Sequence, residues 1–350
     1  MNQILAKRYK KLSVLILIMI LTSLYFNIIA LANPFLTIHH LIREKEIYSI
    51  FAAVKMMWGY KLYIVSILII GFSIIFPFIK LTFLFLLCFV IKDAKIRCRI
   101  ISIIEPLAKW SMLDVFVICM LLVLTNEQIF ISSVPDIGIY YFLIAIFISI
   151  FSSIIISILC EKTYPVYAEK LTKKIIFIAE KFTATEKAVM IILVIISIIF
   201  FAFAITDNYI KVSEFLLYPN KYSILHTFLA LMPLSKILAW FFAFVLFVFP
   251  FIIFNDLLLY WCISYQPDFH ITIFRIIIFL SKFMMLDVFC LALILLLVEG
   301  KVIIQTESSR GIYMLELYVF MSFFIPIFMR VYFQLRYYFN NHRYREKKAL

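Results

Sequence analysis

The sequence predicts an all-α polytopic membrane protein with eight transmembrane helices, arranged as two tandem four-helix repeats. Of the 350 residues, 65% are hydrophobic and only 15% are charged, which is more apolar surface than a soluble core uses. The apolar residues form runs of about 18 or more, and about 20 residues span the hydrocarbon layer as a helix. These runs predict the membrane helices, and a repeated motif predicts their grouping.

The octapeptide Lys109–Phe116 (KWSMLDVF) recurs as Lys282–Phe289 (KFMMLDVF), 173 residues later. Several blocks that keep one offset indicate duplication of a whole unit, because in a chain rich in Phe and Ile a single match would be weak. The same offset relates two further pairs of segments, Phe76–Ile79 to Phe249–Ile252 and Gly138–Tyr140 to Gly311–Tyr313.

The first unit, residues 1–160, is expected to hold four helices. A cleaved signal peptide ending near Ala30–Ala32 is the alternative for the first, but its counterpart in the second unit is internal. The second run is long enough to tilt or kink, and Pro77 removes a helical hydrogen bond near its middle. The expected helices are Leu12–Ala32, Leu62–Ile91, Trp110–Leu124 and Gly138–Leu159.

The second unit, residues 188–350, repeats this plan, with Pro250 in the place of Pro77. Between the units, Glu161–Lys187 is too charged to span a membrane, and its apolar stripe opposite several lysines is typical of an amphipathic helix on a cytoplasmic membrane surface. The four expected helices are Ala188–Ile205, Ile237–Ile263, Ile276–Val298 and Ile312–Met329.

Lysine and arginine set the orientation, because they collect in cytoplasmic loops. Of the 33 basic residues, 23 lie in the flanks that include both termini, Lys92–Lys109 and the linker, whereas nine lie in the opposite flanks. We therefore expect cytoplasmic N- and C-termini. The net charge of +13 follows from this bias and does not require a nucleic-acid partner.

The segment Lys109–Val117 resembles the signature of the paraquat-inducible protein A family, a Trp-Ser-Met-(Ile/Leu)-Asp-Val-Phe-Val string in a four-helix membrane unit. Trp58–Tyr60 and Phe76–Lys80 are similar to two further segments of that family. The resemblance implies a bacterial inner-membrane protein, often with two such units, that works with periplasmic MCE-domain proteins, which form lipid tunnels across the envelope.

The cysteines depart from this family, whose typical members carry zinc-ribbon cysteine pairs before each unit. The six cysteines form no Cys-x-x-Cys pair, so we expect no metal site and no cofactor, and we interpret the thiols as small buried side chains. They are Cys88, Cys98, Cys119, Cys160, Cys262 and Cys290.

Ionisable residues within membrane helices are costly and are therefore candidates for function. Asp114 and Asp287 fall in the first turns of expected helices, where favourable interaction with the helix dipole is the simpler explanation. Lys109 and Lys282 lie five residues earlier, about 140° away around a helix, so neither is expected to pair with its own aspartate. We expect both lysines to extend to the cytoplasmic interface.

A sharper hypothesis adds the polar residues that follow each proline. Lys80 and Thr82 follow Pro77, and Asn255 and Asp256 follow Pro250. Kinked helices with polar groups are tolerated where they face protein or a watery cavity. The hypothesis is a polar cavity in which Lys80 neutralises one or more aspartates, and which either relays protons or holds the helices in register. Its members are Lys80, Thr82, Asp114, Asn255, Asp256 and Asp287.

Other chemistries find no support in the residues. The five histidines lie in loops or at helix ends, without the paired placement that a haem needs, and no Gly-rich phosphate loop or nucleophile motif occurs. We therefore do not expect an enzyme. The leading expectation is an inner-membrane subunit that moves phospholipid-like molecules between the membrane and an MCE-domain tunnel. A secondary transporter of a small solute or ion, and a non-transporting anchor for a periplasmic partner, remain as alternatives.

Overall fold

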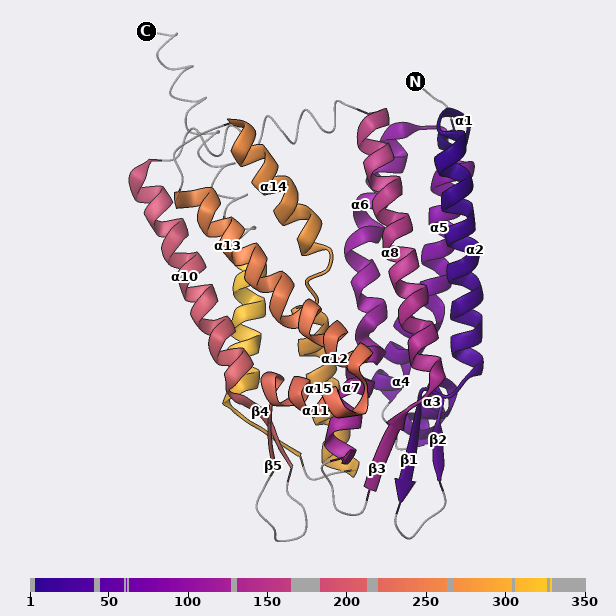
Figure 1. The fold of residues 1–350 in the computed structure, drawn as a ribbon, viewed down its shortest axis with the longest axis vertical. Helices are drawn as coiled ribbons and strands as arrows, with labels where there is room; N and C mark the ends of the chain where they lie inside the picture. The colour runs from indigo at the N-terminus through magenta and orange to yellow at the C-terminus, as the bar shows by residue number, and fades with distance from the viewer. Residues whose placement is uncertain are drawn as a thin grey trace.

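The computed structural model describes residues 4–40, 45–59, 61, 63–126, 131–164, 183–212, 220–262, 267–303, 306–325 and 328. The described chain is mostly helical. Helices of the first half form one bundle and helices of the second half form another beside it, with short strands at the end of the molecule away from α1 (Figure 1). Of the expected linker Glu161–Lys187, residues 165–182 lie outside the described ranges.

The described residues of the first half form ten helical segments, several of which run directly into one another. They are α1 (Leu5–Arg8), α2 (Lys10–Ala32), α3 (Ile50–Gly59), α4 (Tyr63–Ile69), η1 (Ile70–Ile75, a π-helix), α5 (Phe76–Phe89), α6 (Ala94–Leu107), η2 (Ala108–Met112, a 3₁₀-helix), α7 (Leu113–Asn126) and α8 (Ile137–Thr163).

The second half follows a similar order. Its elements are α10 (Ala184–Thr206), α11 (Ile224–Leu234), α12 (Lys236–Ala243), η3 (Phe244–Val248, a π-helix), α13 (Phe249–Cys262), α14 (Pro267–Ser281), α15 (Leu286–Ile303) and a last helix over residues 310–325.

Seven helical stretches within the described residues are long and apolar enough to cross a membrane. Six of the seven match expected helices within a few residues. The exception is the third. The expected eighth helix, Ile312–Met329, is described as helix over residues 310–325, and most of its last residues lie outside the described ranges.

The expected third helix, Trp110–Leu124, begins too late. One helical stretch runs from Ala94 to Asn126 through α6, η2 and α7, so most of the expected loop Lys92–Lys109 is helix. The basic residues of that segment favoured a loop, but they lie on different sides of α6: Lys95 and Arg99 are exposed, whereas Arg97 between them is buried. Likewise α14 and α15 carry the equivalent stretch of the second half.

The heptad spacing of small and polar residues explains how α2 packs on α8. The buried residues of α2 alternate at intervals of three and four, and the Ser23 hydroxyl donates 2.8 Å to the carbonyl oxygen of Ala145 on α8. In an apolar bilayer, small residues and interhelical hydrogen bonds provide the attraction that hydrophobicity does not. The apolar outer face, including Ile18 and Tyr25, is exposed, as expected for lipid contact.

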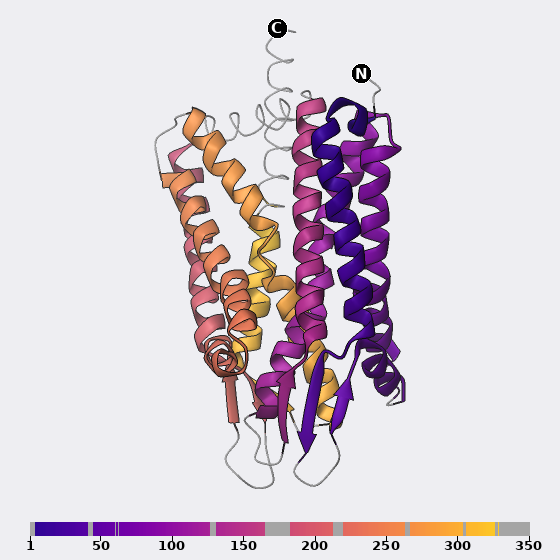
Figure 2. The same ribbon diagram turned by 45° about the vertical axis from the view of Figure 1, so that its right-hand side comes forward.

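Two small antiparallel sheets, which the sequence did not predict, lie at the strand end. The first has the order β2-β1-β3 and the second β5-β4-β6; both lie at the same end of the two bundles (Figure 2). Their strands are short and come from the connections between helices at that end: β1 (Leu36–His40), β2 (Glu46–Tyr48), β3 (Ile131–Pro135), β4 (Asn208–Val212), β5 (Asn220–Ser223) and β6 (Thr306–Ser308).

Each of the expected proline kinks is preceded by a π-helical segment. The N–H of Phe76, just before Pro77, donates to the carbonyl oxygen of Gly71, and the N–H of Phe249, just before Pro250, donates to that of Phe244. Both bonds span five residues instead of four. A π-bulge widens the turn and accommodates a proline ring that would otherwise clash with the preceding turn. The helices therefore continue through the prolines.

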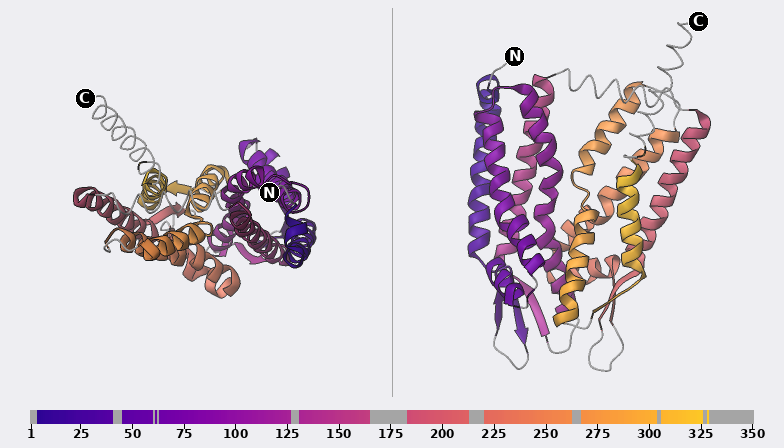
Figure 3. Two further views of the ribbon diagram at one scale, coloured as in Figure 1. Left: turned by 90° about the horizontal axis from the view of Figure 1, so that it is seen from above. Right: turned by 180° about the vertical axis from the view of Figure 1, so that it is seen from behind.

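The two halves meet along an aromatic contact centred on the repeated motif. Phe116 and Phe289, equivalent residues of the two copies, pack edge to face with ring centroids 5.6 Å apart. Phe116 also contacts Phe241 and Phe242 of α12. Seen from above, the two bundles stand side by side (Figure 3), and this contact joins them.

Candidate functional site

The repeated motif also places charged residues where the two halves meet. Lys109, on η2 of the first half, lies with its Nζ 2.5 Å from Oδ2 of Asp287, on α15 of the second half. Both side chains are largely buried, with 16% and 7% of their surfaces exposed. Each lysine was expected not to pair with its own aspartate; Lys109 instead pairs with the aspartate of the other copy.

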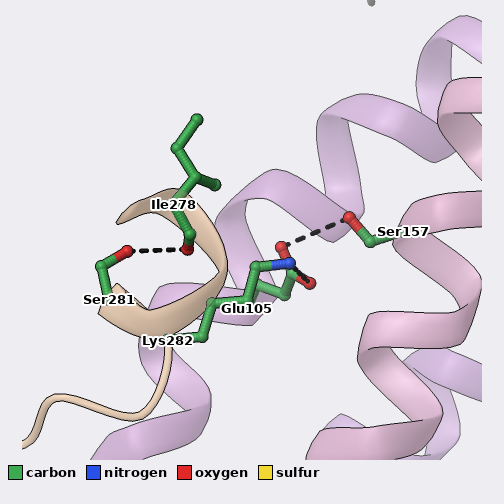
Figure 4. Close-up of polar contacts among 5 residues, drawn as sticks. All are labelled: Glu105, Ser157, Ile278, Ser281 and Lys282. Atoms are coloured by element: carbon green, nitrogen blue, oxygen red, sulfur yellow. Dashed lines mark hydrogen bonds and ion pairs between the residues drawn. The ribbon is translucent and has the colours of Figure 1, made fainter. Parts of the chain in front are cut away.

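A second ion pair joins the halves, and here the lysine belongs to the second half and the carboxylate to the first. Lys282, which follows α14, donates from Nζ to Oε1 of Glu105 on α6 at 2.6 Å. The second carboxylate oxygen of Glu105 accepts a hydrogen bond from Ser157 of α8 at 3.5 Å. Figure 4 shows Glu105 held between Lys282 and Ser157. Lys80, which is 2% exposed on α5, also interacts electrostatically with Glu105.

Asp114 is buried on α7, with 6% exposure, and faces the π-helical segment. The Ser73 hydroxyl of η1 lies beside its carboxylate. Among the described residues, neither Ser73 Oγ nor Asp114 Oδ2 has a partner in hydrogen-bond geometry. A buried carboxylate without a full set of partners is costly in an apolar environment. Such a group is a candidate for function, because stability alone does not explain it.

We call these six ionisable residues, Lys80, Glu105, Lys109, Asp114, Lys282 and Asp287, the charge cluster. It consists of the two ion pairs, of Lys80, which interacts electrostatically with Glu105, and of Asp114, which lies beside Ser73. It contains three lysines and three carboxylates, so its formal charge is zero when all are ionised. Two of its lysines are paired with carboxylates across the halves, Lys109 with Asp287 and Lys282 with Glu105, and pairing offsets the cost of a charge at membrane depth, which is about 3 kcal/mol on insertion scales. The cluster also requires both halves, because neither half alone contains all its partners.

The structure does not bring all the predicted cavity residues together. Thr82 and Asn255 are exposed and donate to the carbonyl oxygens of Phe78 and Phe251 in their own helices. Asp256 is partly buried on α13, and its Oδ2 has no partner among the described residues. Thr82 and Asn255 therefore satisfy their own helices and contribute nothing to the charge cluster.

Two sequence interpretations of the charged residues need correction. Lys109 and Lys282 do not extend to an interface but form the two ion pairs, because η2 and the α14–α15 connection lie within long helical stretches. Lys80, expected to neutralise an aspartate, lies near Glu105 instead. The helix-dipole account weakens for Asp114, since η2 runs into α7 and leaves no free helix end there.

Glu105 is the member that sequence reasoning missed. It was assigned to a cytoplasmic loop because of the basic residues around it. A signal was present: at the offset of the repeated motif, the position 173 residues later is Ile278, so a carboxylate stands where the second half has an apolar side chain. Lys80 shows the same asymmetry, since its counterpart is Ile253.

The cluster can hold, exchange or move protons and can bind charged head groups, but the described residues do not suggest a metal. No group of three or more His, Cys, Asp or Glu in the described ranges could hold an ion. The cysteines are free, and five of the six are buried, which fits the expectation of small interior side chains. Cys262 is exposed.

The comparisons with known proteins point to one family. No curated protein and no solved structure matches the chain significantly. The family model described as paraquat-inducible protein A matches residues 15–158, which run from α2 nearly to the end of α8 and include Lys109–Val117. The resemblance that this motif carries is therefore confirmed, and residues 15–158 of this membrane protein match paraquat-inducible protein A.

Proposed function

We propose that the chain is an inner-membrane subunit of an envelope lipid-transport system, and that it moves phospholipid-like molecules between the membrane and a periplasmic MCE-domain tunnel. The observation that carries this proposal is the paraquat-inducible protein A match over residues 15–158. The charge cluster supports it, because four of its six members lie within the matched residues and two of those four pair with Lys282 and Asp287 of the second half. Lipid head groups are themselves charged and would need such partners within the membrane.

We also propose that the chain consists of two tandem units with eight membrane helices. The buried residues of α2, namely Ile16, Ile20, Ser23, Asn27 and Ala30, have counterparts 174 residues later in the buried residues of α10, namely Met190, Val194, Ser197, Phe201 and Ala204. Each half also carries a three-stranded sheet with an N-terminal strand in its centre and a π-helical segment before a proline. These shared features support duplication of one unit.

The charge cluster is proposed to rearrange during transport. Ion pairs between the halves can break and re-form at little net cost if the charges exchange partners or protons, whereas an apolar interface has no such alternative arrangement. Asp114, with an incompletely satisfied carboxylate, is the group in the described residues best placed to take up a proton. The substitution Asp114→Asn decides whether the cluster relays protons or keeps the halves in register.

The sheets are the proposed contact for the periplasmic partner. They lie at the end of the bundles opposite α1 (Figure 1), which positive-inside counting assigns to the periplasm. Each sheet presents an edge strand, β2 or β5, that has one neighbour in its sheet. Unpaired strand edges are ready-made sites for another chain.

The experiment that tests the function is purification in nanodiscs from the native membrane, followed by mass spectrometry of proteins and lipids that co-purify. Recovery of an MCE-domain protein together with phospholipid is the expected result. A chain that carries neither would contradict the proposal. Lipid cross-linked between the two units would distinguish a transporting subunit from an anchor that only docks the tunnel.

A secondary transporter of a small solute or ion is the second candidate. The specific observation in its favour is the neutral cluster of six ionisable residues within membrane helices, since such groups line ion and proton pathways. The two candidates differ in proteoliposomes. A pH gradient that drives solute uptake without an MCE partner would favour the second, and lipid transfer that requires the partner would favour the first.

A further inference from the structure

Arg97 carries a buried positive charge outside the charge cluster. It lies in the first turns of α6, and its side chain is 0% exposed. The guanidinium remains charged at all physiological pH values. A buried charge is tolerated when it is paired and its hydrogen bonds are satisfied, so the partners of Arg97 decide what the site is for.

One edge of the guanidinium is fixed by the protein and the other is not. Nη1 donates to the carbonyl oxygen of Ile91, in the α5–α6 turn, at 3.4 Å. Nε and Nη2 are buried, and neither has a hydrogen-bond partner among the described residues. Nε–H and Nη2–H point in the same direction and form the fork that binds two oxygens of a carboxylate or phosphate side by side.

The neighbouring side chains do not supply an anion for this fork. The thiol of Cys160, on α8, lies beside the guanidinium, but a thiol is a weak acceptor. Asp93 accepts a hydrogen bond from the backbone N–H of Lys95, and Glu161 is exposed at the end of α8. Within the described residues no ion pair joins either carboxylate to Arg97.

The position of Arg97 indicates where the anion comes from. The α5–α6 turn lies at the same end of the bundle as α1 (Figure 1), and exposed Lys92, Lys95 and Arg99 surround the start of α6. Basic residues at this depth attract the phosphates of membrane lipids. Leu87, Cys88 and Ile101 are buried nearby in the same apolar cluster, which suits a group whose other end is an acyl chain.

We propose that the Nε–Nη2 edge of Arg97 is a binding site for the phosphate of a phospholipid head group, at the membrane surface on the α1 side of the first unit. Nη1 and the Ile91 carbonyl hold the guanidinium in place, and the two remaining donors bind two phosphate oxygens. The site does not rest on lipid transport, because a lipid that stays bound would occupy it as well. A free phosphate ion has the same chemistry, and the test separates the two sources.

The experiment compares the wild-type chain with Arg97→Lys and Arg99→Gln in nanodiscs or mild detergent. Lysine keeps the charge at position 97 but removes the two parallel N–H donors. Arg99→Gln is the matched control, because it removes one exposed charge near the start of the same helix. Native mass spectrometry counts retained phosphatidylglycerol, and thermal unfolding is measured with added phosphatidylglycerol, diacylglycerol or inorganic phosphate.

The wild type and Arg99→Gln are expected to retain phosphatidylglycerol, and Arg97→Lys is expected to retain it about tenfold more weakly, since charge-assisted bidentate bonds are strong. Phosphatidylglycerol should raise the unfolding temperature of the wild type, and diacylglycerol should not. If inorganic phosphate raises the unfolding temperature of the wild type and phosphatidylglycerol does not, the anion does not come from a lipid. Equal lipid retention and equal stabilisation in Arg97→Lys and the wild type would overturn the site.

Where Arg97→Lys fails to fold, Arg97→Met provides the second measurement, because an apolar side chain of similar length removes the buried charge without leaving it unpaired. This variant is expected to fold and to lose the stabilisation by phosphatidylglycerol. Stabilisation equal to that of the wild type would contradict the proposal. Because partner recovery is measured separately, loss of lipid at Arg97 with an MCE partner still bound would leave the proposed function standing.

Discussion

At the scale of single residues, the charge cluster shows why removing one charge differs from removing two. Lys109 and Asp287 are largely buried and 2.5 Å apart. Breaking such a pair leaves an uncompensated buried charge, whereas replacing both partners by apolar groups is often neutral. The pair therefore links the halves through a penalty for separation, even if its net contribution to stability is small.

The first prediction is a double-mutant cycle on this pair. Asp287→Asn alone is expected to destabilise the protein by about 3 kcal/mol, because Lys109 loses its partner. Adding Lys109→Met should recover most of that loss. Thermal or denaturant unfolding in nanodiscs measures both. Lys95→Met, at an exposed position on α6, is the control and should change stability by less than about 0.5 kcal/mol. Additive losses in the double variant would show that the two side chains do not interact.

The second prediction separates the two roles of Asp114. Asp114→Asn keeps the shape of the side chain and removes its charge and its capacity to exchange a proton. If the cluster relays protons, the variant folds with unchanged or higher stability, since a buried unsatisfied carboxylate is lost, and lipid or proton transfer falls by about tenfold or more. Unchanged transfer with normal folding would eliminate the relay and leave the structural role.

At the scale of elements, the repeated glycines have a steric reason. Gly138 begins α8, and its N–H donates 3.0 Å to the carbonyl oxygen of Pro34, just after α2. A Cβ at Gly138 would clash with that oxygen and with the Phe35 ring. Gly311 meets the backbone of Asp207 and Asn208 after α10 in the same way. In each half, the absence of a side chain lets the last helix approach the end of the first.

The third prediction follows from this contact. Gly138→Ala and Gly311→Ala are each expected to lower the unfolding free energy by about 2 kcal/mol, because most of the atoms that a Cβ would meet belong to the backbone, which cannot move aside cheaply. Gly71→Ala is the matched control, since nothing lies within 4 Å of a Cβ there. Calorimetry or thermal unfolding of the three variants makes the comparison. A loss in Gly71→Ala as large as in the other two would contradict the steric account.

The sequence predicted the helices well where a long apolar run defines them. The prediction failed where basic residues lie within a helix. Leu12–Ala32 was expected and α2 covers Lys10–Ala32, because a long apolar run has no other stable structure in a membrane. The stretch that contains α6 was assigned to a loop since its basic residues resemble a cytoplasmic flank. The sheets were missed because strands of three to five residues carry too short a pattern to detect.

The candidate site was predicted in part for the same reason. Asp114 and Asp287 stood out as rare charges in apolar runs, and both are buried. Glu105 and the pairing of Lys109 with Asp287 depend on how α6 and α15 approach one another, which no local pattern contains. Thr82 was wrongly included because position along a helix does not reveal which side faces the protein; its hydroxyl bonds its own helix.

At the scale of the whole molecule, the two bundles touch at the strand end and diverge toward the opposite end (Figure 3). The aromatic contact of Phe116 and Phe289 and both ion pairs hold them together. Further contacts also join the halves, among them the 2.8 Å hydrogen bond between the hydroxyls of Tyr140 and Ser235. If the proposed lipid movement follows this contact, it is coupled to the charge cluster, and the proposed partner requires that the strand end face the periplasm.

The last prediction tests that orientation by cysteine labelling in whole cells. Ile47 of β2 is 64% exposed at the strand end, and Lys95 is exposed near the start of α6 at the other. In a Cys262→Ser background, which removes the one exposed native thiol among six, Ile47→Cys should react with a membrane-impermeant maleimide in cells whose outer membrane alone is permeabilised. Lys95→Cys should react only after the inner membrane is opened. The reverse pattern would place the sheets in the cytoplasm, and a periplasmic partner could not then bind their edges.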